Sequence, residues 1–110
     1  MEISDIRWEG QLNRYNPEES KLLFRLPSGS YIYKKWKWKS GYLTAWGDHR
    51  IFQPFYQLFL NEEEYNKVRE SYGGVSWDNG IHFYGGYYIY IHNDWYSADE
   101  VFKRVMNLIL

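Results

Sequence analysis

Short runs of alternating aromatic and polar residues in the first half of the chain predict an antiparallel meander. Successive side chains of a strand point to opposite faces, so such runs between turn residues indicate strands. Leu22–Leu26 and Tyr31–Trp38 are separated by a Pro-Ser-Gly-Ser turn, and Lys39–Gly41 is predicted as a tight connection into Tyr42–Trp46. A weaker alternation at Asp5–Glu9 favours a further strand before the meander.

The pattern is interrupted after the meander and then changes from strand to helix. Gly47–Arg50 is expected to be a loop, and Phe55–Leu60 returns to strand character with Pro54 at its start. Asn61 begins a capping box with the glutamate three residues on. This spacing predicts a helix over about residues 62–72, which ends at two glycines.

The C-terminal part of the chain predicts further strands and a second helix. Val75–Trp77 and Ile81–Tyr84 flank an Asp-Asn-Gly step, which supplies the positive φ angles of a hairpin turn. Two glycines then lead into Tyr87–His92 as another strand. A second capping box at Ser97 precedes an amphipathic helix over residues 101–109.

This order of elements predicts an α+β fold. We expect an antiparallel sheet of about five or six strands with two helices packed on one face. The elements along the chain are a β-meander, a helix, a hairpin or second meander, and a C-terminal helix. With 110 residues, the chain is expected to form a single compact domain over residues 1–110.

Composition and charge exclude several kinds of chemistry. The chain has no Cys, so disulfides, thiol nucleophiles and Cys-ligated metals are excluded. Its 13 basic and 14 acidic residues give a net charge of −1, which argues against non-specific nucleic-acid binding. No apolar stretch could span a membrane and no export signal begins the chain, so we expect a cytoplasmic protein.

The charge is unevenly distributed along the chain. Residues 1–50 carry 9 basic and 6 acidic groups, whereas residues 51–110 carry 4 basic and 8 acidic groups. Part of this acidic excess is explained by glutamates and aspartates in the first turns of the two predicted helices, where the helix dipole favours negative charge. The meander is therefore expected to be the basic half of the molecule.

The aromatic content is high, with 6 Trp, 12 Tyr and 6 Phe. Trp and Tyr dominate protein interfaces because they bury a large area and keep a polar tip. This composition favours a non-enzymatic interaction protein with a protein partner, of the inhibitor or neutraliser type that phages and plasmids encode. A homodimer is a further expectation, because an exposed meander can pair with a second copy.

The strand Tyr31–Trp38 provides the first candidate binding surface. One of its faces carries phenols and ammonium groups: Tyr31, Tyr33, Lys35, Lys37 and Lys39. The other carries Ile32, Lys34, Trp36 and Trp38, and both tryptophans are candidates for partner binding. Phenols and lysines together suit an anionic ligand that stacks, such as a nucleotide. The alternative is a solvated face whose lysines prevent edge-to-edge pairing.

A second candidate surface is expected on the C-terminal strands. There, imidazoles and phenols share one face: His82, Tyr84, Tyr88, Tyr90 and His92. This cluster suits the binding of a polar ligand, or general acid–base catalysis in a metal-independent nuclease or similar hydrolase. An outer sheet face with incidental histidines is the alternative to both.

Other polar motifs give no catalytic or metal site. Asp48, His49 and Arg50 are typical of a loop, and the three histidines lack the spacing of metal ligands. We therefore predict no catalytic residues, no metal and no cofactor. A protein partner is the first hypothesis, a small anionic ligand the second and hydrolase activity the third.

Overall fold

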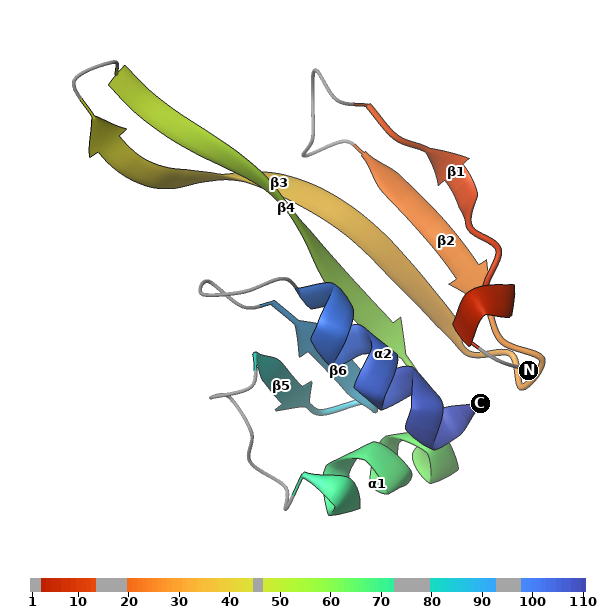
Figure 1. Ribbon diagram of the computed structural model, residues 1–110. Coiled ribbons are helices and arrows are strands. Elements are labelled where there is room, and N and C mark those ends of the chain that lie inside the picture. The colour runs from red at the N-terminus through yellow and green to blue at the C-terminus, as the bar shows by residue number, and fades with distance from the viewer. Residues whose placement is uncertain (1–2, 14–19, 45–46, 73–79, 93–97) are drawn as a thin grey trace.

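The computed structural model describes residues 3–13, 20–44, 47–72, 80–92 and 98–110. These form a six-stranded antiparallel sheet with two α-helices on one face (Figure 1). The α+β fold that the order of elements predicts is thereby confirmed.

A short 3₁₀ helix precedes the described strands and helices of the fold. The bounds are η1 (Ile3–Asp5), β1 (Glu9–Gln11), β2 (Lys21–Arg25), β3 (Tyr31–Thr44), β4 (Gly47–Phe59), α1 (Glu62–Ser71), β5 (Ile81–Tyr84), β6 (Tyr88–Ile91) and α2 (Ala98–Ile109). The strand order is β1-β2-β3-β4-β6-β5, so β1 and β5 are the edges of this sheet. The chain thus forms a four-stranded meander, to which the β5–β6 hairpin is added beyond β4.

β3 and β4 form one long hairpin instead of the shorter strands that the sequence predicts. Lys39–Gly41 is not a connection: the pairing of β3 with β4 continues past Gly41 to Thr44, with a shift in register. A β-bulge absorbs one extra residue without ending the ladder, which explains why the glycine does not end the strand. The prediction of a separate strand at Tyr42–Trp46 is therefore wrong.

The predicted loop at Gly47–Arg50 is also wrong, because these residues begin β4 and pair with the end of β3. Pro54 lies inside β4, opposite Trp36, and not at the start of a strand. Proline is tolerated there because β4 pairs with β6 only from Tyr56 onward, so β4 is an edge strand at Pro54. The far part of the hairpin extends beyond the helices (Figure 1).

The N-terminal segment differs from the predicted strand at Asp5–Glu9. A 3₁₀ helix covers Ile3–Asp5, and β1 begins only at Glu9. The physical reason is packing: apolar side chains of this segment, including Trp8, lie against the core next to α2. The Trp8 ring is 5.9 Å from the ring of Phe102, measured between centroids.

The core lies between the sheet and the helices. Ile32, Leu58 and Ile89 occupy opposite positions on β3, β4 and β6, and all three are fully buried. Val105 and Met106 of α2 belong to the same buried cluster. Because side chains alternate along each strand, the residues between these core positions point to the face that the helices leave uncovered.

α1 begins with the capping box that the sequence predicts. The Asn61 side chain accepts a hydrogen bond of 2.8 Å from the backbone N–H of Glu64. The backbone N–H of Asn61 in turn donates one of 3.2 Å to Glu64 Oε1. The buried Glu64 carboxylate also accepts hydrogen bonds from the Ser30 hydroxyl and, at 2.9 Å, from Ser28 Oγ. This carboxylate therefore connects the start of α1 to the turn between β2 and β3.

The C-terminal elements follow the prediction where the structure describes them. α2 is the expected amphipathic helix, and its side chains at helical spacing, such as Val101 and Phe102, are buried. β5 pairs with β6 through a turn at residues 85–87. The predicted hairpin partner Val75–Trp77 and the predicted N-cap Ser97 lie outside the described residues. None of the described helices is long and apolar enough to cross a membrane.

Candidate interaction surface

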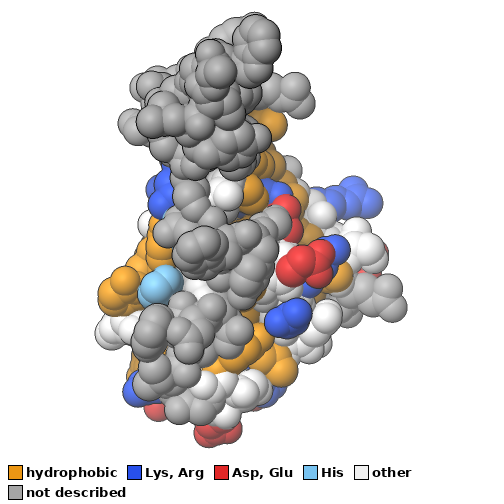
Figure 2. Space-filling model, turned by 60° about the vertical axis from the view of Figure 1, so that its left-hand side comes forward, with side chains coloured by type: hydrophobic (Ala, Val, Ile, Leu, Met, Phe, Trp, Pro, Cys, Tyr) orange, Lys and Arg blue, Asp and Glu red, His pale blue; other side chains and the backbone are white. Residues whose placement is uncertain are grey.

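The sheet face opposite the helices carries aromatic side chains from four neighbouring strands. We call this surface the open face. Its rings belong to Tyr31, Tyr33, Phe55, Phe59, His82, Tyr84, Tyr88 and Tyr90. All of these side chains are at least partly exposed, and Tyr84 has 50% of its surface accessible. Figure 2 shows hydrophobic side chains at the molecular surface around a histidine, with basic groups above and below them.

One row of rings crosses four of the six strands of this face. Tyr31, Phe59, Tyr88 and Tyr84 are successive cross-strand neighbours on β3, β4, β6 and β5. The ring centroids of Tyr31 and Phe59 are 4.8 Å apart with near-parallel planes, and those of Phe59 and Tyr88 are 4.9 Å apart. Tyr84 stacks on Tyr88 at 5.5 Å. These offset contacts hold the side chains in fixed positions before any partner binds.

A second row lies beside the first. Tyr33, Gln57, Tyr90 and His82 are the successive neighbours on the same four strands. The His82 and Tyr90 rings are 5.8 Å apart, measured between centroids. Gln57 Nε2 donates a hydrogen bond of 3.0 Å to the Tyr88 hydroxyl, which connects the two rows. The rows therefore form one continuous surface.

The Tyr88 hydroxyl keeps its proton on this surface. Burial raises the pKa of Tyr88; the Gln57 hydrogen bond lowers it, and the neighbouring Tyr84 raises it further. The pKa lies above its ordinary value of 10.0, so at neutral pH Tyr88 is an uncharged phenol. It can donate or accept a hydrogen bond, but it provides no anionic base.

Ammonium groups lie over the rings at the end of the open face nearer the hairpin tip. Lys35 Nζ is 5.5 Å from the centroid of the Tyr33 ring, and Lys21 Nζ is 5.9 Å from the same ring. Lys37 Nζ is 5.6 Å from the centroid of the Phe55 ring. Such cation–π contacts order long lysine side chains without neutralising their charge.

The two surfaces that the sequence predicts separately therefore lie on one face. Tyr31, Tyr33, Lys35 and Lys37 are on this face, and so are His82, Tyr84, Tyr88 and Tyr90. The His92 ring lies next to Tyr90, with the centroids 6.1 Å apart. Trp36 projects from the opposite face of β3, where Lys34 Nζ is 5.3 Å from its ring centroid. The side chains of Trp38, Lys39 and His49 lie outside the described part of the chain.

Sequence reasoning missed the residues that join the two surfaces. Phe55, Gln57 and Phe59 alternate with the buried Tyr56 and Leu58 along β4. Alternation could have placed them on the open face. Their position between the two predicted surfaces depends on the strand order, in which β4 lies between β3 and β6. Short strand patterns do not specify that order.

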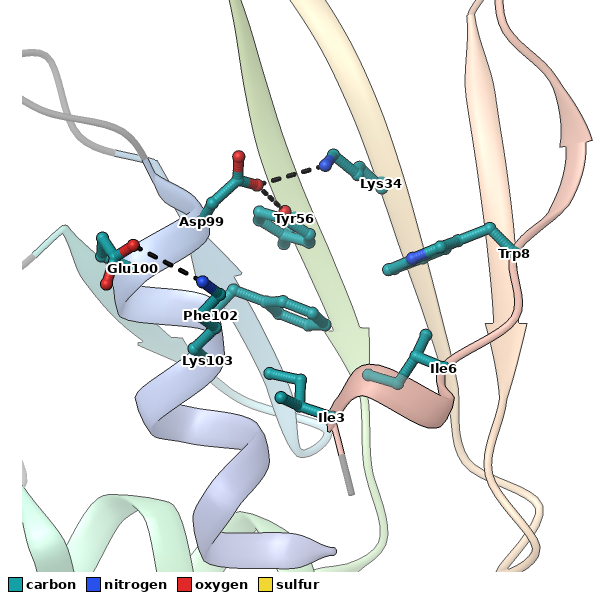
Figure 3. A pocket seen from close by; sticks show the side chains of 9 residues that line it. All are labelled: Ile3, Ile6, Trp8, Lys34, Tyr56, Asp99, Glu100, Phe102 and Lys103. Carbon is teal, nitrogen blue, oxygen red and sulfur yellow. Dashed lines mark hydrogen bonds and ion pairs between the residues drawn. The ribbon is translucent and has the colours of Figure 1, made fainter. Parts of the chain in front are cut away.

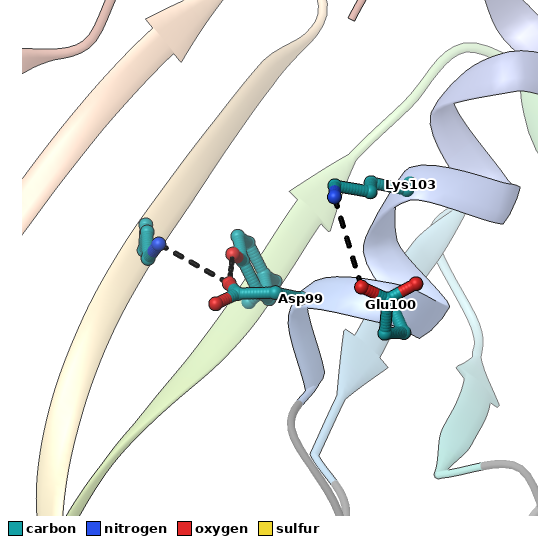
Figure 4. A network of polar contacts seen from close by, with 5 residues as sticks. Asp99, Glu100 and Lys103 are labelled. Carbon is teal, nitrogen blue, oxygen red and sulfur yellow. Dashed lines mark hydrogen bonds and ion pairs between the residues drawn. The ribbon is translucent and has the colours of Figure 1, made fainter.

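A hollow of about 350 Å³ on the helix side of the sheet contains a polar network. Lys34 Nζ lies 3.2 Å from Asp99 Oδ1, and the Tyr56 hydroxyl donates a hydrogen bond to the same oxygen (Figures 3 and 4). The Tyr56 ring is parallel to that of Phe102, with the centroids 4.0 Å apart. Ile3, Ile6 and Trp8 form the apolar side of the hollow (Figure 3).

This network connects α2 to the sheet. Burial raises the pKa of Tyr56 well above its usual range, and both the hydrogen bond to Asp99 and the charge of that carboxylate raise it further. Tyr56 is therefore a neutral donor. Lys34, Tyr56 and Asp99 each have a polar partner within this network. This arrangement suits a structural contact between helix and strand.

Neither metal coordination nor similarity to known proteins identifies a function. Within the described residues, no group of three or more His, Asp or Glu side chains could hold a metal ion. Comparisons with protein-family models, curated proteins and solved structures find no match to this chain. A function can therefore be inferred only from the geometry of the open face.

Proposed function

We propose that this chain is a non-enzymatic binding protein that holds a protein partner against the open face. The observation that carries this proposal is the continuous row of contacting rings from Tyr31 to Tyr84 on a face that neither helix covers. Aromatic side chains held in place before binding lose little entropy when a partner covers them, and they dominate the energy of protein interfaces.

A protein of this kind acts by covering a site on its partner, which is the inhibitor or neutraliser role. Origin on a phage or plasmid and location in the cytoplasm belong to the same proposal, on the sequence arguments given above. The open face consists largely of partly buried rings with polar tips, as interface cores do.

The proposal is tested by affinity purification of the tagged protein from cells of its source. A protein that copurifies is identified by mass spectrometry, purified and titrated against the wild type and the Tyr31→Ser/Phe59→Ser variant. We expect the variant to lose at least about tenfold in affinity, since central aromatic residues are interface hot spots. Tyr87→Ser is the matched control, because Tyr87 is exposed but contacts Tyr65 of α1. Equal affinity of all three proteins would refute the proposal.

A second candidate function is the binding of a small anionic ligand such as a nucleotide. It is supported by the ammonium groups of Lys35 and Lys37 over the rings of Tyr33 and Phe55, whereas the hollow of about 410 Å³ that borders Tyr31 and Phe59 at the turn end of the open face has no lysine or arginine in its lining. Native mass spectrometry of the gently purified protein separates the two candidates. An adduct of small mass, without a copurifying protein, would favour the small ligand.

A further inference from the structure

The charges of the protein are distributed unequally between its two faces. Lys21, Arg25, Lys35 and Lys37 project from the open face, and the one acidic residue among the described strand side chains of that face is Glu9 of β1. The exposed side chains of the helices are of both signs, with Glu62, Glu63, Glu70 and Glu100 beside Lys67, Arg69, Lys103 and Arg104. The open face is therefore basic, although the net charge of the whole chain is −1.

The ammonium groups of the open-face lysines are held over aromatic rings. Lys21, Lys35 and Lys37 contact the rings of Tyr33 and Phe55 and form no ion pair with any described carboxylate. On α1 and α2, by contrast, Lys67 and Lys103 each lie 3.7 Å from a glutamate oxygen. The basic groups of the open face are therefore available to an anionic partner.

The open face has an aromatic part and a basic part side by side. The row from Tyr31 to Tyr84 is uncharged, and the lysines lie two and three rows away from it toward the hairpin tip. Interfaces commonly combine an apolar centre with complementary charges that fix its orientation. This arrangement matches a protein surface that presents an apolar segment beside carboxylates.

We infer that the partner is an acidic protein, which places Asp or Glu side chains over Lys35 and Lys37 and an apolar segment over Tyr31 and Phe59. This inference rests on the proposed function, because it names the partner of the same surface. A single-stranded nucleic acid is less well matched. Its long run of phosphates needs an extended basic track, whereas the described basic side chains of this face are confined to β2 and the adjoining part of β3, with Glu9 of β1 on the same face.

Three labelled probes test the inference by fluorescence anisotropy. They are a short fluorescein-labelled peptide of alternating Glu and Phe, the same peptide with Gln in place of Glu, and an oligothymidylate of equal charge. We expect the Glu peptide to bind, and the Gln peptide to bind at least about tenfold more weakly. Binding of the Glu peptide should weaken as salt increases.

Paired variants show which lysines are responsible. Lys35→Ala/Lys37→Ala is expected to lower affinity for the Glu peptide about tenfold, and Lys35→Arg/Lys37→Arg to restore it. Lys67→Ala/Lys103→Ala removes the same charge from the helices and should leave affinity unchanged. Circular dichroism of each variant confirms that it is folded.

Several outcomes would overturn the inference. They are failure of the wild type to bind the Glu peptide, equal binding of the Glu and Gln peptides, and tighter binding of the oligothymidylate. The copurified partner separates this failure from failure of the proposed function. If Tyr31→Ser/Phe59→Ser abolishes partner binding and Lys35→Ala/Lys37→Ala does not change it, the open face is the binding site but the partner is not recognised by its acidity.

Discussion

The hydroxyl group of Tyr56 donates a hydrogen bond to Asp99 Oδ1, and this bond connects β4 to the first turn of α2 (Figure 4). Tyr56 is only 2% exposed, so little of its side chain is accessible to water. The same carboxylate oxygen pairs with Lys34 of β3. One aspartate thus holds α2 against two neighbouring strands.

The first prediction concerns the strength of this contact. Tyr56→Phe should lower the free energy of unfolding by about 1.5–3 kcal/mol, because the acceptor is charged. Tyr65→Phe is the matched control, since the Tyr65 hydroxyl donates at 3.1 Å to the neutral backbone oxygen of Tyr84. Its expected loss is about 0.5–1.5 kcal/mol. Urea unfolding of the three proteins measures the difference, and equal losses would contradict the structural role given to Asp99.

The second prediction is loss of stability at high pH. The pKa of Tyr56 is raised in the folded state, so above the ordinary value of 10.0 the unfolded chain releases a proton that the folded chain retains. The free energy of unfolding should therefore decrease as pH rises above 10, with a contribution from Tyr56 of about 1.4 kcal/mol per pH unit. The Tyr56→Phe variant lacks this contribution. Its free energy of unfolding should therefore decrease less steeply with pH, by about 1.4 kcal/mol per pH unit. Tyr84→Phe serves as the control on an exposed tyrosine, and an identical slope for both variants would count against the prediction.

Local sequence patterns predicted most of the elements but not their complete arrangement. The capping box of Asn61 and the spacing of Val101 and Phe102 act within one helix, and both helices follow them. The long hairpin was missed because its ladder of hydrogen bonds continues past Gly41 and through Pro54, which in isolation are breaking signals.

The site was predicted as two surfaces because its parts are distant in sequence. Alternation correctly assigned Tyr31 and Tyr33 to one face of their strand and Tyr88 and Tyr90 to one face of another. The two predicted surfaces become one because β4 lies between these strands and places Phe59 between Tyr31 and Tyr88. Strand order is a property of long-range packing, so a reading of single strands does not supply it.

The third prediction concerns the buried carboxylate at the start of α1. Ser30→Ala removes one hydrogen bond to Glu64 and should cost about 1.5–3 kcal/mol of unfolding free energy, since the acceptor is charged and buried. Glu63→Ala, next to Glu64 in the first turn of α1, removes an exposed ion pair with Lys67 and a favourable charge at the helix N-terminus, and it should cost less than about 1 kcal/mol. Thermal unfolding compares the two variants. A cost for Glu63→Ala as large as that for Ser30→Ala would contradict the connection between α1 and the β2–β3 turn.

The fourth prediction tests the contact between β1 and β2. Gly10 has a φ angle of +117°, and a Cβ atom at this position would lie 2.7 Å from the backbone oxygen of Lys21. Gly10→Ala should therefore destabilise the pairing of these strands by about 1–3 kcal/mol. Hydrogen exchange should become faster at the β2 amides that face β1. Gly85→Ala is the control, because a Cβ there meets no atom within 4 Å, and similar effects of both substitutions would contradict the prediction.

The last prediction determines which face of β3 contacts the partner. The sequence makes Trp36 a candidate for partner binding. In the structure it lies on the helix side of the sheet, with the Lys34 ammonium over its ring. Trp36→Ala should lower stability by about 0.5–1 kcal/mol through loss of this cation–π contact, and it should leave partner affinity unchanged. Lys35→Ala should have the opposite effects, a small change in stability and a loss of affinity, because its side chain projects from the open face toward the Tyr33 ring. Calorimetric titration of the copurified partner with both variants measures the affinities. If only Trp36→Ala weakened binding, the partner would occupy the helix side of the hairpin, and the open face would not be the interaction surface.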